Sequence, residues 1–248
     1  MKTIKIILIA FLGAAGLFLT PGCFFDLDDD QDVFGCVKGE GTIVSEEINL
    51  RNFDAIELKI SADVYIRQGS EQKVVVEGQH NIIDELERNV DDGIWKIETD
   101  RCVRNHDDLR IYITLPDITL LRISGPGDII SENTLVVNDI ELSISGSGKI
   151  DIAVDADDIN AKTSGSGDML LEGKGDVLTY QVSGSGDLRA FNLRMRAANI
   201  NISGSGDADV HVSDELDIRI SGSGNVSYKG NPQVDARITG SGRVINAN

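Results

Sequence analysis

The amino-acid sequence predicts an all-β solenoid, a single-stranded parallel β-helix-like fold with coils of about 18–21 residues. Three observations predict this fold: an excess of glycine, a tetrapeptide repeated at nearly constant spacing, and apolar residues that alternate between the repeats. The chain has 248 residues with 26 glycines but only 4 prolines, so the excess is neither collagen-like nor typical of a Pro/Gly-rich disordered segment.

The repeated tetrapeptide is Ser-Gly-Ser-Gly or a close variant, and it starts at successive intervals of 21, 19, 19, 20, 18 and 18 residues. We expect its glycines to form sharp corners, through either a positive φ or a close approach between backbones. The seven motifs hold fourteen of the glycines: Gly125, Gly127, Gly146, Gly148, Gly165, Gly167, Gly184, Gly186, Gly204, Gly206, Gly222, Gly224, Gly240 and Gly242.

Between the motifs, apolar residues recur with period two, which is the pattern of a half-buried strand. In three coils, two such strands flank a predicted polar turn, at 155–158, 213–215 and 230–232. A short strand with one apolar face cannot bury that face alone, but stacking successive coils in register buries it. The residues before the motifs are then expected to form an interior ladder: Ile123, Ile144, Thr163, Val182, Ile202, Ile220 and Ile238, of which only Thr163 is not aliphatic. The alternative, a sandwich of hairpins with the motifs as loops, explains the narrow spacing less well.

Two regions follow from this pattern: a repeat solenoid at 124–248, and a degenerate solenoid and cap region at 36–123. In the cap region, Ile60–Ile66 is interpreted as a corner that has lost its glycines. Strands are expected at 74–76, 94–97 and 109–115, and a short helix at 81–90 with Asn81 as its N-cap. No cap is evident at 244–248, so self-association through the solenoid ends is expected.

The N-terminus predicts a lipoprotein signal peptide at 1–22. Lys2 and Lys5 precede an apolar run at 6–19, and the following Leu-Thr-Pro-Gly-Cys resembles the lipobox of bacterial lipoproteins, in which Cys23 would carry the lipid that attaches the protein to a membrane. The alternatives are an ordinary signal peptide with a chance cysteine, or an uncleaved anchor. Residues 23–35 form an acidic tether that resembles the surface-export tag of Bacteroidetes-type lipoproteins. The expected location is therefore the outer membrane, lipid-anchored and exposed at the cell surface, with a periplasm-facing position as the alternative.

The charge balance excludes nucleic acid as a partner. The chain has 23 Lys+Arg against 41 Asp+Glu, a net charge of −18. Removal of residues 1–22 takes away two lysines and no acids, so the mature balance is 21 minus 41, or −20. A chain of this charge repels phosphate backbones.

The remaining residues that could carry site chemistry are few. Cys36 and Cys102 could form a disulfide in an oxidising compartment, and the three histidines stand apart without zinc-ligand spacing. Asp168, Asp187 and Asp207 each follow a corner, which leaves weak calcium binding as an alternative. The spacing differs from the nonapeptide calcium pattern, so we favour a turn-capping role and expect no metal or cofactor.

No catalytic residue is predicted, because the sequence contains no nucleophile elbow, phosphate loop or Cys/His pairing. The expected function is non-enzymatic binding or structural support, with an unknown protein or glycan as partner. The alternatives are a carbohydrate-active enzyme built on a β-helix, or a periplasm-facing structural component of the envelope.

The segments Arg51–Glu57, Asp63–Gly69, Val74–Gly78 and Asn81–Asp84, together with the Ser-Gly-Ser-Gly-Asp corners, resemble the head GIN domain family. The resemblance covers roughly residues 53–233. It implies a β-helical solenoid of the autotransporter adhesin-like kind that is common among Bacteroidetes lipoproteins, and it brings no catalytic or binding residues. Ser61-Ala62 departs from the family pattern, where a Ser-Gly-Ser-Gly corner is common.

Overall fold

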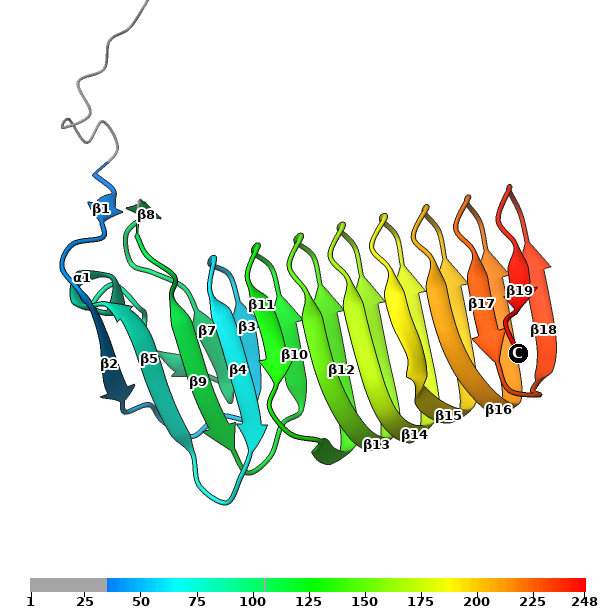
Figure 1. The fold of residues 1–248 in the computed structure, drawn as a ribbon, viewed down its shortest axis with the longest axis horizontal. Coiled ribbons are helices and arrows are strands. Elements are labelled where there is room, and N and C mark those ends of the chain that lie inside the picture. Colours follow the sequence, from blue (N-terminus) through cyan, green and yellow to red (C-terminus); the bar gives the residue numbers. More distant parts are fainter. Residues whose placement is uncertain (1–34, 105) are drawn as a thin grey trace, which may run out of the picture. The chain divides into compact units, whose positions relative to one another are not determined.

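The computed structural model describes residues 35–104 and 106–248 and confirms the solenoid (Figure 1). The predicted signal peptide, Cys23 and nearly all of the acidic tether lie outside these residues. In the described part, the strands stack coil upon coil, and the corners line up along one edge of the stack. Among the described residues, no helix has the length and apolar character needed to cross a membrane.

The regular coils are parallel and in register, apart from register shifts between Leu170 and Glu172 and between Ala190 and Ala197. Their long strands are β12 (Leu135–Ile144), β13 (Ile150–Thr163), β14 (Met169–Val182), β15 (Leu188–Ile202) and β16 (Ala208–Ile220). Each strand ends at a corner and pairs with the equivalent residues of the next coil, so that Ile144, Thr163 and Val182 are direct neighbours. The apolar residues of both strand halves point inward and form one continuous core.

The interior ladder is confirmed in six of its seven positions. Ile123, Ile144, Thr163, Val182, Ile202 and Ile220 are all buried, with exposed fractions of 0–2%. Ile238 is 43% exposed, because it belongs to the last coil and no further coil covers it.

The predicted polar turns opposite the corners are only partly confirmed. Residues 155–158 and 213–215 lie inside β13 and β16 rather than between separate strands. Asp155, Ala156 and Asp158 keep ladder partners in β14, and Ala156 is buried. Ser213 and Asp214 have no ladder partner, and residues 213–215 are exposed. Of the three predicted turns, only the one at 230–232 separates two strands, β17 (Val226–Lys229) and β18 (Gln233–Ile238). The chain then closes with β19 (Val244–Asn246).

The cap region contains two further coils, but they do not stack in chain order. One coil consists of β3 (Ala55–Leu58) and β4 (Asp63–Gln68), and it lies against β10 (Leu120–Ile123) and β11 (Asp128–Ser131). The other consists of β7 (Ile94–Ile97) and β9 (Arg110–Leu115), which pair with the opposite edges of β3 and β4. The later segment of the chain therefore forms the earlier layer of the stack.

Antiparallel strands close this end of the solenoid. β5 (Lys73–Gln79) runs antiparallel to β9, β2 (Ile43–Ile48) runs antiparallel to β5, and the short β6 (Val90–Asp91) pairs with β7. The predicted helix is wrong in length: α1 covers only His80–Ile83. Asn81 does not cap it. Its side chain instead donates to the carbonyl of Lys38 and accepts from the N–H of Glu40. Ile82, Ile83 and Leu86 are buried as their spacing indicates.

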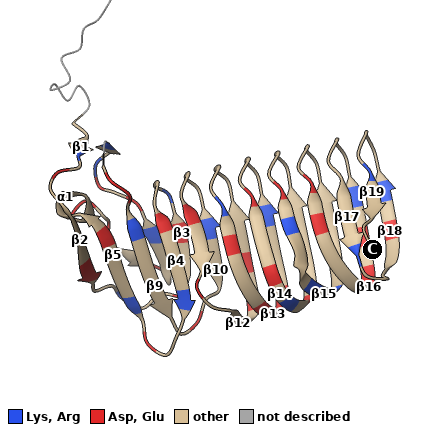
Figure 2. Ribbon diagram, viewed as in Figure 1, with Lys and Arg blue, Asp and Glu red and all other residues tan. Residues whose placement is uncertain are grey.

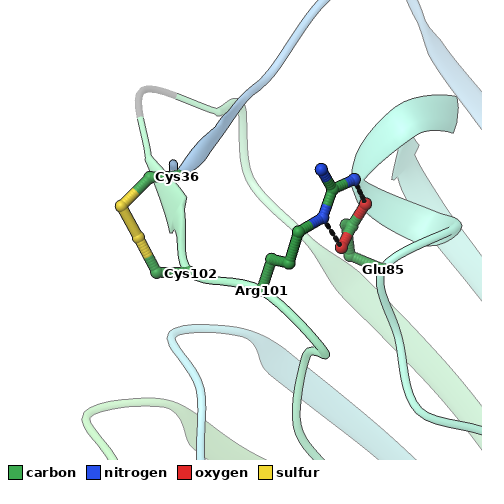
Figure 3. Close-up of a disulfide and its surroundings, with 4 residues drawn as sticks. All are labelled: Cys36, Glu85, Arg101 and Cys102. Carbon is green, nitrogen blue, oxygen red and sulfur yellow. Dashed lines mark hydrogen bonds and ion pairs between the residues drawn. A yellow bond between two sulfur atoms is a disulfide. The ribbon is translucent and has the colours of Figure 1, made fainter. Parts of the chain in front are cut away.

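A disulfide joins Cys36 to Cys102, with 4.7 Å between their Cα atoms (Figure 3). It flanks a small parallel sheet made of β1 (Val37–Lys38) and β8 (Val103–Arg104). The first described residues are thereby fixed to a segment 66 positions later in the chain.

Candidate binding site: the corner row and the groove beside it

The corner glycines stack directly on one another from coil to coil. A Cβ on Gly186 would lie less than 3.0 Å from the carbonyl oxygen of Gly167, and the same holds between Gly204 and Gly184. Among the fourteen corner glycines only Gly240 has a positive φ. Of the two roles that the sequence left open, close backbone approach is therefore the general one.

The same geometry explains the corner that lacks glycine. Lys59–Ala62 forms a true corner between β3 and β4, as the sequence predicts, and Gly125 and Gly127 stack on its carbonyl groups. The layer below it passes from β7 to β9 through the long segment 98–109 rather than through a tight corner. Side chains at Ser61 and Ala62 therefore meet no corner beneath them.

The aspartates after the corners cap the next coil. Asp168 Oδ1 accepts the backbone N–H of Asp187 at 2.9 Å, and Asp187 Oδ1 accepts that of Asp207 at 2.9 Å. Asp207 continues the pattern with Asn225 at 2.6 Å, and Asp128 with Lys149 at 2.7 Å. Within residues 35–104 and 106–248, no group of three or more His, Cys, Asp or Glu side chains is placed to hold a metal ion. The structure therefore adds no support for the calcium alternative.

A shallow groove of about 340 Å³ runs beside the corners, across the coils. One side consists of outward-facing residues that are register neighbours in successive coils: Lys162, Gln181, Asn201, Arg219 and Arg237. The other side is a row of hydroxyl groups from the first residue of each corner: Ser183, Ser203, Ser221 and Thr239. The groove thus presents a cation or amide on each of five coils and a corner hydroxyl on four of them, at the spacing of about 4.8 Å between strands.

The groove differs in charge from the chain as a whole. Figure 2 shows Asp and Glu on coil after coil, with Lys and Arg between them. The groove lining, by contrast, contains three cations and no carboxylate. Arg237 lies 3.6 Å from Asp235, whereas Lys162 and Arg219 form no ion pair within the described part of the chain. These two cations are available to an anionic group of a ligand.

Thr163, the one polar member of the ladder, has a partner inside the core. The hydroxyl of Tyr180 lies 3.5 Å from both Thr163 Oγ1 and the carbonyl oxygen of Gly186. Burial raises the pKa of Tyr180 to about 12. A buried phenol needs a hydrogen-bond partner, and Thr163 supplies one where the other coils have an aliphatic side chain.

Two ionic contacts stabilise the cap region. Arg101, next to Cys102, donates from Nε to Glu85 Oε2 at 3.0 Å and pairs with the other carboxylate oxygen (Figure 3). These hydrogen bonds lower the pKa of the Glu85 carboxyl group, and Glu85 is only 8% exposed. His80 Nδ1 contacts Glu46 Oε1 at 2.5 Å, and this hydrogen bond raises the pKa of the imidazole. Both contacts lie at the solenoid end, far along the stack from the groove.

The corners can be predicted from the sequence motifs, whereas the groove was not predicted. The groove is lined by the residue two positions before the first residue of a corner and by that first residue itself, not by the aspartates that follow the corners. The sequence does contain a signal for the groove. The positions two residues before the corners repeat with the spacing of the motifs and carry polar or cationic side chains in five successive coils.

Comparisons with known proteins agree with this architecture. Residues 52–232 match the family described as "Putative auto-transporter adhesin, head GIN domain". A solved structure of a "putative adhesin" from Bacteroides fragilis has a TM-score of 0.80 and 25% identity, covering 85% of this chain and 99% of its own. A "putative lipid binding protein" from Parabacteroides distasonis has a TM-score of 0.70 and 24% identity, with 85% of this chain and 99% of that chain covered.

A "putative adhesin" from Parabacteroides merdae, at 19% identity and a TM-score of 0.69, shares the fold over 85% of this chain and 99% of its own. No curated protein matches the chain. The family match covers most of the sequence, and it includes the cap region from residue 52 onward and six of the seven corners. This chain belongs to the head GIN domain family of adhesin-like proteins.

Proposed function

We propose that this protein is a lipid-anchored, adhesin-like solenoid displayed at the outer cell surface, where it binds a partner without chemical catalysis. The match of residues 52–232 to an adhesin family is the observation that carries the proposal. Lipid attachment at Cys23, an acidic tether at 23–35 and a rigid stack of coils together form an anchor, a spacer and a binding surface.

The groove beside the corners is the surface we assign to the partner. Its lining contains neither a carboxylate nor a histidine, the groups that most often act as general acid or base, which favours binding over catalysis. This composition also argues against the alternative of a carbohydrate-active enzyme with its reaction in this groove, since such enzymes use paired carboxylates.

A glycan that carries acidic groups fits the groove better than a peptide. The groove crosses the strands, and the backbone groups of those strands already pair with neighbouring coils. An extended peptide, which binds best by adding to a strand edge, would find no backbone partners there. Hydroxyl and amide side chains at each coil can instead bond sugar hydroxyls, and Lys162 and Arg219 can bind carboxylate or sulfate groups.

The test compares two double variants that remove the same charge. Lys162→Ala/Arg219→Ala changes the groove, while Arg194→Ala/Arg196→Ala changes two exposed cations on β15 outside it. On an array of neutral and acidic polysaccharides, we expect the wild type and the β15 variant to retain acidic glycans through a salt-sensitive contact, and the groove variant to lose about tenfold or more in affinity. Equal binding by both variants would show that the groove is not the glycan-binding surface. Retention of immobilised proteins but no glycan would make the partner a protein, and released sugar products would establish the enzyme alternative.

A further inference from the structure

The last coil of the solenoid leaves part of the described core uncovered. β18 pairs only with β16, and β19 only with β17, so each presents a free edge beyond the last coil. Two of the four exposed large apolar side chains of the described residues lie here: Ile238 at 43% and Ile245 at 45%. Val234 and Val244 are only partly buried against the core.

The backbone of β18 has unpaired hydrogen-bonding groups along its free edge. Thr239 donates its N–H to the carbonyl of Ile220 in the coil below. Because backbone groups alternate in direction along a parallel strand, the N–H and C=O groups of Val234, Ala236 and Ile238 point to the free edge. Unpaired strand edges of this kind recruit further strands unless they are covered.

The side chains of β18 specify which strand can pair with it. Val234, Ala236 and Ile238 continue the inward rows of Leu216, Ile218 and Ile220, while Asp235 and Arg237 face outward. An antiparallel copy of β18 keeps inward residues opposite inward residues only in alternate registers. A register centred on Asp235 sets two aspartates against each other, and one centred on Arg237 sets two arginines against each other. Centred on Ala236, the pairing places Asp235 opposite Arg237 of the second copy, twice by symmetry, and Val234 opposite Ile238.

We infer that the C-terminal coil is a homodimer interface, in which β18 pairs antiparallel with β18 of a second copy around a two-fold axis at Ala236. In this register the edge groups of Ala236 meet their own copies and those of Val234 meet Ile238, as hydrogen-bonded pairs require. The outward Asp235 and Arg237 form the closer, non-hydrogen-bonded pairs, where opposite charges attract most strongly. The same axis brings the two β19 strands together near Asn246, which lies as far beyond its corner as Ala236 lies before it.

The opposite end of the solenoid is a poorer partner. There β2 covers only one of the two sheet faces, and the other face ends in the two-residue β6. A head-to-tail filament would therefore pair one face at most, whereas a two-fold contact between C-terminal coils pairs both and closes on itself.

The test uses residues 23–248 with Cys23→Ser so that no lipid is added. Sedimentation velocity from about 1 to about 500 µM should show a reversible monomer–dimer equilibrium, since a single coil offers a small interface. Asp235→Arg and Arg237→Asp each place like charges opposite one another, and each should weaken the dimer by roughly tenfold or more. The exchanged variant Asp235→Arg/Arg237→Asp restores both pairs and should dimerise like the wild type.

The exchanged variant also controls for folding, because a general defect would not be repaired by a second substitution. Circular dichroism of all variants at low concentration should show the same β-sheet signal. Monomer at every concentration, growth into open filaments, or a dimer that is equally strong in all four proteins would each overturn the proposed pairing. Arg237 also lines the groove, but the glycan test changes only Lys162 and Arg219, so different variants report a failure of the strand pairing and a failure of the groove.

Discussion

Glycine has one main task in this molecule, which is to let corners lie directly above one another. The corner at Lys59–Ala62 manages without glycine because no tight corner lies beneath it, and every tight corner above it carries two. The conformational freedom of glycine matters much less, since Gly240 alone among these fourteen has a positive φ. The missing side chain, rather than backbone flexibility, explains the repeated choice.

We therefore predict that Gly186→Ala lowers the free energy of unfolding by about 1–3 kcal/mol, because its Cβ meets the backbone carbonyl of Gly167 and backbone cannot move aside as a flexible side chain can. Urea unfolding followed by circular dichroism measures this. Ser185→Ala, in the same corner and at an exposed position, is the matched control and should leave the midpoint within error of the wild type. Equal midpoints for the two variants would show that the corners have room for a methyl group.

Tyr180 gives the core a measurable response to alkaline pH. Its pKa is raised from 10.0 to about 12 by burial, so the folded state keeps the phenol proton where the unfolded state has lost it. This contribution to stability is present below pH 10 and is lost as the pH rises from about 10 to about 12. Tyr180→Phe should therefore lose stability less steeply than the wild type over this interval, in unfolding midpoints measured at successive pH values. Parallel curves for the wild type and Tyr180→Phe would contradict the argument.

At the scale of elements, the cap region covers the end of the solenoid, whereas the coils cover one another. A solenoid needs an end that does not expose strand edges, and here antiparallel β2 and β5, the short α1 and the β1–β8 pair provide it. The disulfide and the Arg101–Glu85 pair both connect the segment after β7 to elements earlier in the chain. They fix a non-local arrangement that local strand pairing would not specify.

Replacing both cysteines, Cys36→Ser/Cys102→Ser, should lower the free energy of unfolding of the cap region by roughly 4 kcal/mol in the chain-entropy model for a loop of this length. Hydrogen exchange measured by mass spectrometry should show faster exchange in β1, β8 and α1, and unchanged protection in β13–β16. Dithiothreitol treatment of the wild type should reproduce this pattern. Uniformly faster exchange through the repeat coils would show that the cap and the solenoid unfold as one unit.

At the scale of the whole molecule, the sequence predicts what repeats and misses what does not. Corner spacing and period-two alternation place the coils, the ladder and the core from Ile123 to Ile220, because each coil meets an identical neighbour. The inverted order of the β3–β4 and β7–β9 layers depends on long-range pairing that no local pattern encodes. The helix at 81–90 was predicted too long, because buried Ile82, Ile83 and Leu86 also suit a single turn followed by an irregular segment. The groove was not predicted because one coil contributes only one or two of its polar residues. These residues form a continuous surface only when five coils are stacked.

Accessibility of the solenoid on intact cells tests the proposed surface role most directly. Cells that produce the protein would be treated with an external protease or with antibodies to residues 35–248, before and after the outer membrane is made permeable. We predict cleavage or labelling on intact cells, and loss of cell-associated protein in Cys23→Ser, which lacks the lipid attachment site. A protein that is reached only after permeabilisation would contradict surface display and assign the solenoid to a periplasm-facing role.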